Sequence, residues 1–281
     1  MTLLGAAEIR ELAAELDLKP SKSLGQNFVH DGNTCLKIVR TAGVQADDVA
    51  LEIGPGLGSL TLAMMQEAKS VVAIEIDKRL ATQLPITAKK HSENPEKLTV
   101  INEDALRIQS LPIDPTVLIA NLPYNVSVPV FLHMLERFPT LRSGVVMVQA
   151  EVADRLAAAP STKDYGVPSV KAAWWAEVSS AGVVSRQIFW PVPNVESKLV
   201  VFTRRETPGD ESLRLKTFEV IDLAFAQRRK MLRSALSSRY GGSAQAENLL
   251  SAAGINPTLR GEALDIAAFV AIALHELAIE S

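Results

Sequence analysis

Short runs of β-branched and aliphatic residues alternate with helical stretches between residues 50 and 202, and this alternation limits the possible folds more than any other feature. It is typical of a parallel sheet whose strands are joined by crossover helices. The expected strands are 49–54, 70–77, 98–104, 116–123 and 143–149, with a helix over 130–138. The sequence therefore predicts a doubly wound, Rossmann-like α/β domain.

The pattern changes after residue 205. From residue 206 onward the chain has apolar side chains at i, i+3 and i+4, which predicts a series of amphipathic helices broken by glycines. Asp265 is placed to cap the last helix, and residues 6–16 form a further amphipathic helix. We therefore expect two domains, 1–205 with the sheet and an N-terminal helical segment, and 206–281 as a small all-helical domain.

The number of cysteines, the spacing of histidines and the length of apolar runs exclude several classes of protein. Cys35 is the single cysteine and the four histidines are scattered, so we expect no disulfide and no metal site. The longest apolar run, 266–274, is far shorter than the roughly 20 residues that a membrane-spanning helix needs, and the N-terminal stretch lacks the basic segment of a signal peptide. We expect a soluble cytoplasmic protein that binds no membrane, and nothing indicates an obligate oligomer, so we expect a monomer.

A glycine-rich turn, E-I-G-P-G-L-G, follows the first expected strand, and closely spaced glycines let a backbone approach a ligand. A dinucleotide fingerprint that starts at Gly54 and Gly56 needs a third glycine at position 59, which is Ser59. Pro55 also removes a backbone donor from the loop. Pyrophosphate binding is therefore disfavoured, and the acid Glu52 suits a cofactor whose amino-acid tail carries an ammonium group.

Two further acids end the next two expected strands. Glu75 can accept both hydroxyls of a ribose, and Asp104 can reach the amino group of an adenine. Both NAD and S-adenosylmethionine contain such a nucleoside. A solvated acid at a strand end is the ordinary alternative for Glu75. Acids at three successive strand ends, next to the glycine turn, predict a nucleoside-binding site.

The fourth expected strand ends in Asn121-Leu122-Pro123-Tyr124, which matches the (N/D)PP(Y/F) pattern of amino methyltransferases. The lone pair of an adenine amino group is delocalised into the ring, so acceptors that hold its N–H protons favour a pyramidal, nucleophilic nitrogen. The Asn121 side chain and the Leu122 backbone carbonyl are the expected acceptors. Pro123 keeps the turn rigid, and Tyr124 offers a face on which a flipped base can stack. A plain strand-ending turn is the alternative.

Seven motifs follow one another along nearly the whole chain. They are S-L-G-Q-N-F-V at 23–29, E-I-G-P-G-L-G at 52–58, A-I-E-I-D at 73–77, N-E-D at 102–104, N-L-P-Y-N-V-S at 121–127, F-W-P-V-P-N-V-E-S at 189–197 and A-F-A-Q-R-R-K-M-L-R-S-A-L at 224–236. In this order they resemble the KsgA-type small-subunit rRNA adenine dimethyltransferases. The resemblance implies an S-adenosylmethionine-dependent methyltransferase fold for the Rossmann-like domain.

The resemblance also assigns residues to the site. It implies that S-adenosylmethionine is contacted by Asn27, the backbone of Val29, Gly54, Gly56, Glu75, Asp104 and Asn121. It further implies that Phe189 joins Tyr124 in sandwiching the target adenine. The alternative for Phe189 is a core aromatic residue beside the sheet.

Basic residues gather in the last of these motifs. The cluster comprises Arg228, Arg229, Lys230, Arg233 and, further on, Arg239, and apolar residues at helical spacing predict a helix with one packed and one cationic face. Further candidates for this surface are Lys19, Lys22, Arg204 and Arg205. Since the net charge is −3, RNA binding must rest on such local clustering. A charge run that merely faces solvent is the alternative.

The resemblance implies methylation of N6 on two adjacent adenines in a 3′-terminal hairpin loop of 16S rRNA. The partner would be an immature small ribosomal subunit, and the role would lie in ribosome biogenesis. A 23S rRNA adenine-N6 methyltransferase of the macrolide-resistance type is a close alternative, although motif 189–197 and the C-terminal helices favour the small-subunit enzyme. A non-catalytic methyltransferase-like nucleic-acid-binding factor would not need Glu75, Asp104 and N-L-P-Y, and Ser59 disfavours a nicotinamide oxidoreductase.

Overall fold

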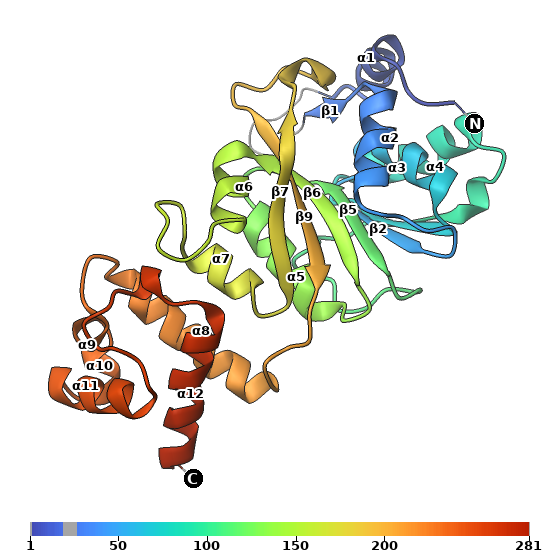
Figure 1. The fold of residues 1–281 in the computed structure, drawn as a ribbon. Helices are drawn as coiled ribbons and strands as arrows, with labels where there is room; N and C mark the ends of the chain where they lie inside the picture. The colour runs from blue at the N-terminus through green and yellow to red at the C-terminus, as the bar shows by residue number, and fades with distance from the viewer. Residues whose placement is uncertain (1, 19–26, 281) are drawn as a thin grey trace. The chain divides into compact units, whose positions relative to one another are not determined.

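The computed structural model describes residues 2–18 and 27–280 and divides into two compact units (Figure 1). The first comprises Met1–Ala153 and Ser179–Arg204, and the second Asp154–Val178 and Arg205–Ser281. Residues 154–178 therefore join the C-terminal helices instead of the predicted first domain. Within the second unit, α7 (Val167–Ala172) packs against α8 (Glu211–Ala226), which accounts for this grouping. The prediction that the chain divides into functional domains after residue 205 is not tested by this grouping and stays a prediction.

A seven-stranded sheet forms the centre of the fold, in the order β4-β3-β2-β5-β6-β9-β7. The strands, in that order, are Leu98–Ile101, Ser70–Ile74, Val49–Ile53, Val117–Asn121, Ser143–Gln149, Ser197–Arg204 and Ala176–Val184. The first five lie parallel, as the sequence predicts, but β9 runs antiparallel to β6, so the sheet is mixed. The chain order reverses between β2 and β5, and ligands of open α/β sheets bind at such a switch point.

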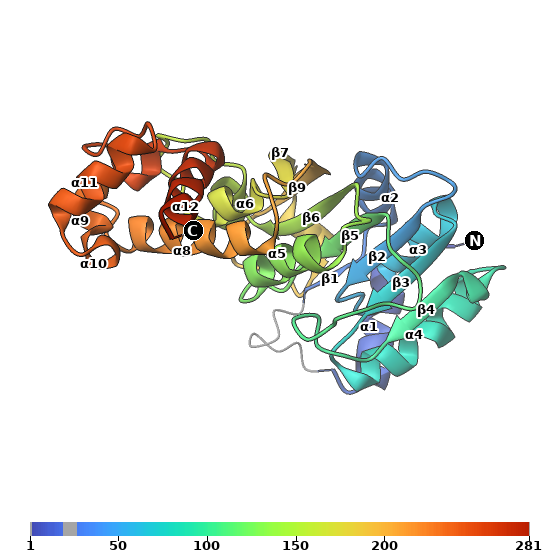
Figure 2. The same ribbon diagram turned by 90° about the horizontal axis from the view of Figure 1, so that it is seen from below.

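Helices flank this sheet, and two of them begin at an aspartate that caps the first turn. The flanking helices are α1 (Ala6–Glu15), α2 (Gly32–Thr41), α3 (Ser59–Glu67), α4 (Lys78–His91), α5 (Ser127–Arg137) and α6 (Ala150–Leu156). Figure 2 shows α3 next to β3 and α4 next to β4. Asp31 caps α2 and Asp77 caps α4, each accepting a backbone N–H with its carboxylate. A two-stranded ladder of β1 (Phe28–Val29) and β8 (Phe189–Trp190) completes the strands.

The second unit contains α9 (Leu232–Ala235), α10 (Ser237–Tyr240), α11 (Ser243–Ala252) and α12 (Ile266–Glu280) in addition to α7 and α8. Asp265 accepts the N–H of Ala268 at 2.9 Å, so the predicted cap of the last helix is confirmed. The prediction of one continuous basic helix is wrong, because α8 ends before Arg228, Arg229 and Lys230, and Arg233 lies in the separate short helix α9. The N–H groups of Leu232 and Arg233 bind the carbonyls of Leu259 and Pro257 instead of continuing a helical ladder.

Across 2–18 and 27–280, no helix is long and apolar enough to cross a membrane.

Candidate cofactor and methyl-transfer site

A cavity of about 280 Å³ lies at the carboxyl ends of the parallel strands. Its lining includes every residue predicted to contact the cofactor, namely Asn27, Val29, Gly54, Gly56, Glu75, Asp104 and Asn121. Five of them come from the ends of four neighbouring strands of the sheet, which the topology brings to one edge, and Asn27 and Val29 come from the segment at β1. Pro123 from the N-L-P-Y motif lines the same cavity.

The backbone of the glycine turn lines the cavity, and its conformation requires glycine. Gly56 has φ of +58°, and a Cβ built there would lie 2.9 Å from the ring of Phe28. Only glycine fits both the left-handed conformation and the close ring. Gly54 has φ of +69° and donates its N–H to the carbonyl of Ile74, which fixes the turn to the neighbouring strand.

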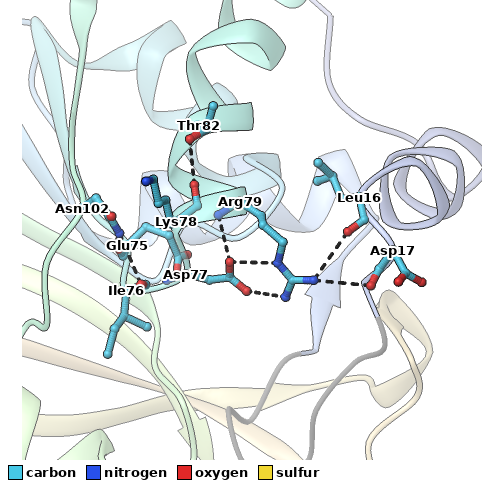
Figure 3. A network of polar contacts seen from close by, with 9 residues as sticks. All are labelled: Leu16, Asp17, Glu75, Ile76, Asp77, Lys78, Arg79, Thr82 and Asn102. Carbon is cyan, nitrogen blue, oxygen red and sulfur yellow. Dashed lines mark hydrogen bonds and ion pairs between the residues drawn. The ribbon is translucent and has the colours of Figure 1, made fainter.

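Glu75 is held by backbone donors. Its Oε1 accepts the N–H of Asp77 at 2.9 Å, and its Oε2 accepts the N–H of Gly56 at 3.2 Å. The side chain is 5% exposed, and burial raises the pKa of Glu75 above its usual range although the backbone hydrogen bonds oppose the shift. Asn102 supports the strand end by donating to the carbonyl of Glu75 at 2.8 Å (Figure 3).

The loop after Glu75 is fastened by an arginine that sequence analysis did not identify. Arg79 donates to both carboxylate oxygens of Asp77, at 3.2 and 2.7 Å. The same guanidinium donates to the carbonyls of Leu16 and Asp17, just after α1 (Figure 3). Arg79 therefore links the C-terminal end of α1 to the loop that carries the ribose-binding candidate.

Glu52 is the most deeply buried acid of the cavity wall. Its side chain accepts the hydroxyl of Thr61 at 2.5 Å, and the residue is 1% exposed. Burial raises the pKa of Glu52 to about 8, despite the Thr61 hydrogen bond that opposes the shift. The carboxyl is therefore mostly protonated at neutral pH, and a neighbouring ammonium group would favour its ionised form.

Asp104 is half-buried at the end of the N-E-D motif. Its Oδ1 accepts the N–H of Leu106 at 2.9 Å, and Arg107 lies 3.8 Å from Oδ2. Leu106 also lines the cavity and is partly exposed, so an apolar surface lies next to the acid. This pairing suits a flat base with an exocyclic amino group.

Asn121 ends β5 with a defined side-chain orientation. Its Nδ2 donates to the backbone carbonyl of Asn27 at 3.1 Å. A carbonyl oxygen can only accept, so the amide nitrogen must face Asn27 and Oδ1 must face away from it. Leu122 is buried and donates its N–H to Met147, and the Tyr124 hydroxyl lies 3.3 Å from the hydroxyl of Ser197. Neither Leu122 nor Tyr124 is among the residues that line the cavity.

Phe189 lies differently from its predicted stacking position. The residue is 1% exposed, and in the β1–β8 ladder it pairs with Val29. This pairing places its ring in the core, which is the alternative that the sequence left open. The neighbouring Trp190 is half-buried and stacks on Phe28 with ring centroids 6.4 Å apart. A sandwich of Phe189 and Tyr124 around a base stays a prediction.

The basic cluster is largely neutralised by acids of its own unit. Arg228 pairs with Glu262 and Arg233 pairs with Glu247, each at 2.7 Å. Arg239 is similarly bound to Glu219 and Glu276. Arg229 and Lys230, in contrast, are exposed and make no ion pair within the described residues.

The further candidates for the RNA surface also differ from expectation. Arg204 is not a surface cation, because its guanidinium donates to the carbonyls of Leu135, Phe138 and Leu141 at the end of α5 and beyond. Lys19 and Lys22, like residues 23–26 of the first motif, lie outside the described residues. Arg205 is exposed, as are Arg229 and Lys230 of the basic cluster, so these three residues remain candidates for the predicted cationic surface.

Several residues that support the site escaped sequence analysis. Thr61, Ser59 and Arg79 act on neighbours through contacts that only the fold creates, whereas Asn102 stands in the N-E-D motif and could have been found there. The described part of the chain contains no group of histidine, cysteine and acidic side chains arranged to hold a metal ion.

The residues of the cavity fit S-adenosylmethionine. Its ammonium, ribose hydroxyls and adenine amino group are all hydrogen-bond donors, and Glu52, Glu75 and Asp104 supply acidic acceptors. The tight turn at Gly56 gives the cofactor a backbone wall without side chains. The donor set of the ligand and the acceptor set of the protein therefore match.

Comparison with known proteins also indicates a methyltransferase. Residues 18–275 match the model of the family described as ribosomal RNA adenine dimethylase. A protein of Leifsonia xyli subsp. xyli, named ribosomal RNA small subunit methyltransferase A, is 58% identical over 97% of this chain and 98% of its own. A protein of the same name from Arthrobacter sp. is 56% identical over 96% of this chain and 92% of its own.

Solved structures share the fold. A dimethyladenosine transferase from Plasmodium falciparum superposes with a TM-score of 0.76 at 22% identity, covering 89% of this chain and 98% of its own. The 23S rRNA methyltransferase ErmE superposes with a TM-score of 0.66 at 26% identity, covering 89% of this chain and 99% of its own. Since the family model spans nearly the whole chain, the chain belongs to the ribosomal RNA adenine dimethylases, the rRNA methyltransferases that use S-adenosylmethionine.

Proposed function

We propose that this protein dimethylates N6 of two adjacent adenines in a hairpin loop near the 3′ end of 16S rRNA. The observation that carries the proposal is the single cavity in which the glycine turn, Glu75, Asp104 and Asn121 meet. The names of the Leifsonia and Arthrobacter relatives favour the small subunit as the substrate.

The cofactor would be held by the acids of the cavity wall. We assign the ribose hydroxyls to Glu75, the adenine amino group to Asp104 and the ammonium group to Glu52. When bound, S-adenosylmethionine supplies a methyl group on a positively charged sulfur. The buried acids stabilise that positive charge and its orientation, because Coulomb interactions are stronger away from water.

The target adenine would be held by the N-L-P-Y motif. Oδ1 of Asn121 and the carbonyl of Leu122 accept the amino N–H groups, which turns the nitrogen lone pair toward the methyl group. These acceptors would hold the amino nitrogen toward the methyl group that the cofactor supplies, and the surplus proton would pass from the nitrogen to water. Holding the two reactants in line contributes most of the acceleration in such a transfer. We place the base against Tyr124, whose half-buried ring lies next to the acceptors in sequence.

The RNA would be positioned by phosphate contacts outside the cavity. The exposed cations Arg205, Arg229 and Lys230 are the candidates of the second unit. We further propose that the substrate is an immature small subunit in the cytoplasm and that the protein acts as a monomer. An RNA adenine presented in a folded loop would compensate for the acidic net charge, since specific shape then replaces general electrostatic attraction.

The test is transfer of labelled methyl groups from S-adenosylmethionine to unmethylated small subunits, large subunits and free rRNA, followed by nucleoside analysis. We expect N6,N6-dimethyladenosine in small subunits, and far slower formation of it with Asn121→Ala. Label confined to large subunits would favour the second candidate, a 23S rRNA methyltransferase, which the structural similarity to ErmE supports. Cofactor binding without transfer to any RNA would favour a non-catalytic binding factor.

A further inference from the structure

Residues 27–29 form a short segment of the cavity wall that is tied at both ends to other elements. At one end the Asn121 amide donates to the carbonyl of Asn27 at 3.1 Å, and at the other the Ser59 hydroxyl donates to the carbonyl of Val29 at 2.5 Å. Asn27, Phe28 and Val29 all line the cavity. The segment therefore connects the start of α3 to the end of β5.

The bond to Asn27 determines which atom Asn121 presents to a substrate. A primary amide can rotate by half a turn and exchange its donor and acceptor at small cost unless a neighbour distinguishes the two. The carbonyl of Asn27 is such a neighbour, because it accepts and cannot donate. If the segment moved away, Oδ1 and Nδ2 of Asn121 could exchange places, and a donor would face the amino group of the base.

Ser59 is the side chain that limits movement of this segment on the α3 side. It is the first residue of α3, it is 7% exposed, and it occupies the position where a dinucleotide fingerprint has glycine. The segment is also held by a two-residue ladder to β8, by the bond from His30 N–H to the carbonyl of Ile188, and by the burial of Phe28 and Val29 in the core. Within this packing, the Ser59 hydroxyl is the side chain that fixes the direction of the Val29 carbonyl.

We propose that Ser59 is a positioning residue for methyl transfer. Its hydroxyl holds Val29, which keeps the carbonyl of Asn27 in place, which in turn fixes the acceptor of Asn121. This inference rests on the acceptor role proposed above for Asn121. It gives a function to the serine that otherwise only argues against pyrophosphate binding.

The first experiment compares Ser59→Ala with Ser59→Thr in single-turnover methyl transfer at saturating S-adenosylmethionine. We expect Ser59→Ala to lower the rate constant roughly 10-fold, because a small misplacement of a positioning group has effects of this order. Ser59→Thr keeps the hydroxyl and should recover most of the rate. An unchanged rate in Ser59→Ala would overturn the proposal.

A matched control separates positioning from general loss of packing. Ser169, at α7 in the other unit, is also buried and donates its hydroxyl to a backbone carbonyl, that of Arg155, at 2.5 Å. Ser169→Ala should lower the melting temperature about as much as Ser59→Ala and leave the rate constant at the parental value. If both variants lose the same fraction of rate, the effect of Ser59 is not positional.

A double-mutant cycle tests whether Ser59 acts through Asn121. Asn121→Asp keeps an acceptor oxygen, but the ionised carboxylate cannot donate to the carbonyl of Asn27. In this background Ser59→Ala should cause no further loss of rate, and an undiminished 10-fold loss would contradict the proposal.

Should Ser59→Ala fail to fold, Ser59→Cys provides the test, since a thiol fills a similar space and donates only weakly. The rate of Ser59→Cys should fall below that of Ser59→Thr. Equal rates in these two variants would overturn the proposal.

The outcomes also distinguish this inference from the proposed function. Full turnover in Asn121→Ala would contradict the acceptor role itself. Loss of turnover in Asn121→Ala with a normal rate in Ser59→Ala would leave the proposed function standing and remove only the positioning role.

Discussion

The cavity of the first unit and the basic cluster of the second use charge in opposite ways. Glu52 and Glu75 are buried, are held by a hydroxyl and by backbone N–H groups, and have raised pKa values. Arg228 and Arg233 are instead matched by acids of their own unit. The comparison teaches that acids of the same unit can neutralise a run of basic residues, whereas the buried acids of the cavity have no cationic partner within the described residues and are left available for a ligand.

The largest effect is expected where the cavity meets the target base. Asn121→Ala removes an acceptor that acts mainly in the transition state, and we expect kcat to fall on the order of 100-fold. Affinity for S-adenosylmethionine should stay within a few-fold, as measured by calorimetry. Asn33→Ala, a surface asparagine of α2, is the matched control and should leave both values unchanged. A kcat equal to that of the parent would contradict the role of Asn121 as an acceptor.

Glu75 tests whether a buried acid of the cavity is kept for a ligand. Glu75→Gln removes a charged acceptor, and we expect the Kd for S-adenosylmethionine to rise roughly 30-fold with little change of kcat at saturation. Glu67→Gln, which changes an acid at the end of α3 that pairs with Arg40, serves as the control. Equal cofactor affinity in Glu75→Gln and the parent would contradict the ribose assignment.

The basic cluster gives the converse test, with two double variants of equal charge change. Arg229→Ala with Lys230→Ala should weaken binding to small subunits about 10-fold and reduce the salt dependence of binding. Arg228→Ala with Arg233→Ala removes cations already paired, so it should chiefly lower the melting temperature. Filter binding at several salt concentrations and thermal unfolding measure the two. Stronger loss of binding in the second variant would mean that the paired arginines exchange their partners for phosphate.

The last prediction concerns stability against pH and leaves methyl transfer aside. In the folded state burial raises the pKa of Glu52 to about 8, from a usual 4.5. Between these values the folded state holds a proton that the unfolded state has lost, so Glu52 lowers stability as pH rises through this window. Glu52→Gln removes the contribution, and its unfolding free energy relative to the parent should increase from about pH 5 to about pH 8.5. Urea unfolding at both pH values measures it, and a difference independent of pH would refute the raised pKa.

Sequence reasoning located the cavity well and the charged surface poorly. The acids and Asn121 follow strands whose apolar pattern is clear, and the carboxyl ends of parallel strands lie at one edge whatever the details of packing. Strands β7 and β9 were not among the expected strands, and the antiparallel pairing of β9 with β6 was therefore not predicted. The run 228–233 has helical spacing, yet its backbone bonds to residues 257–259 interrupt the helix.

By itself the sequence determined where the five parallel strands lie along the chain, the glycine turn and the residues at the strand ends. These features depend on local periodicity and on residue type, and both can be read from neighbouring residues in the sequence. Only the tertiary structure decided that Phe189 is buried, that Arg228 meets Glu262, and that Ser59 and Asn121 hold the same short segment. Each of these is a contact between residues far apart in sequence, and its energy depends on geometry that no local pattern specifies.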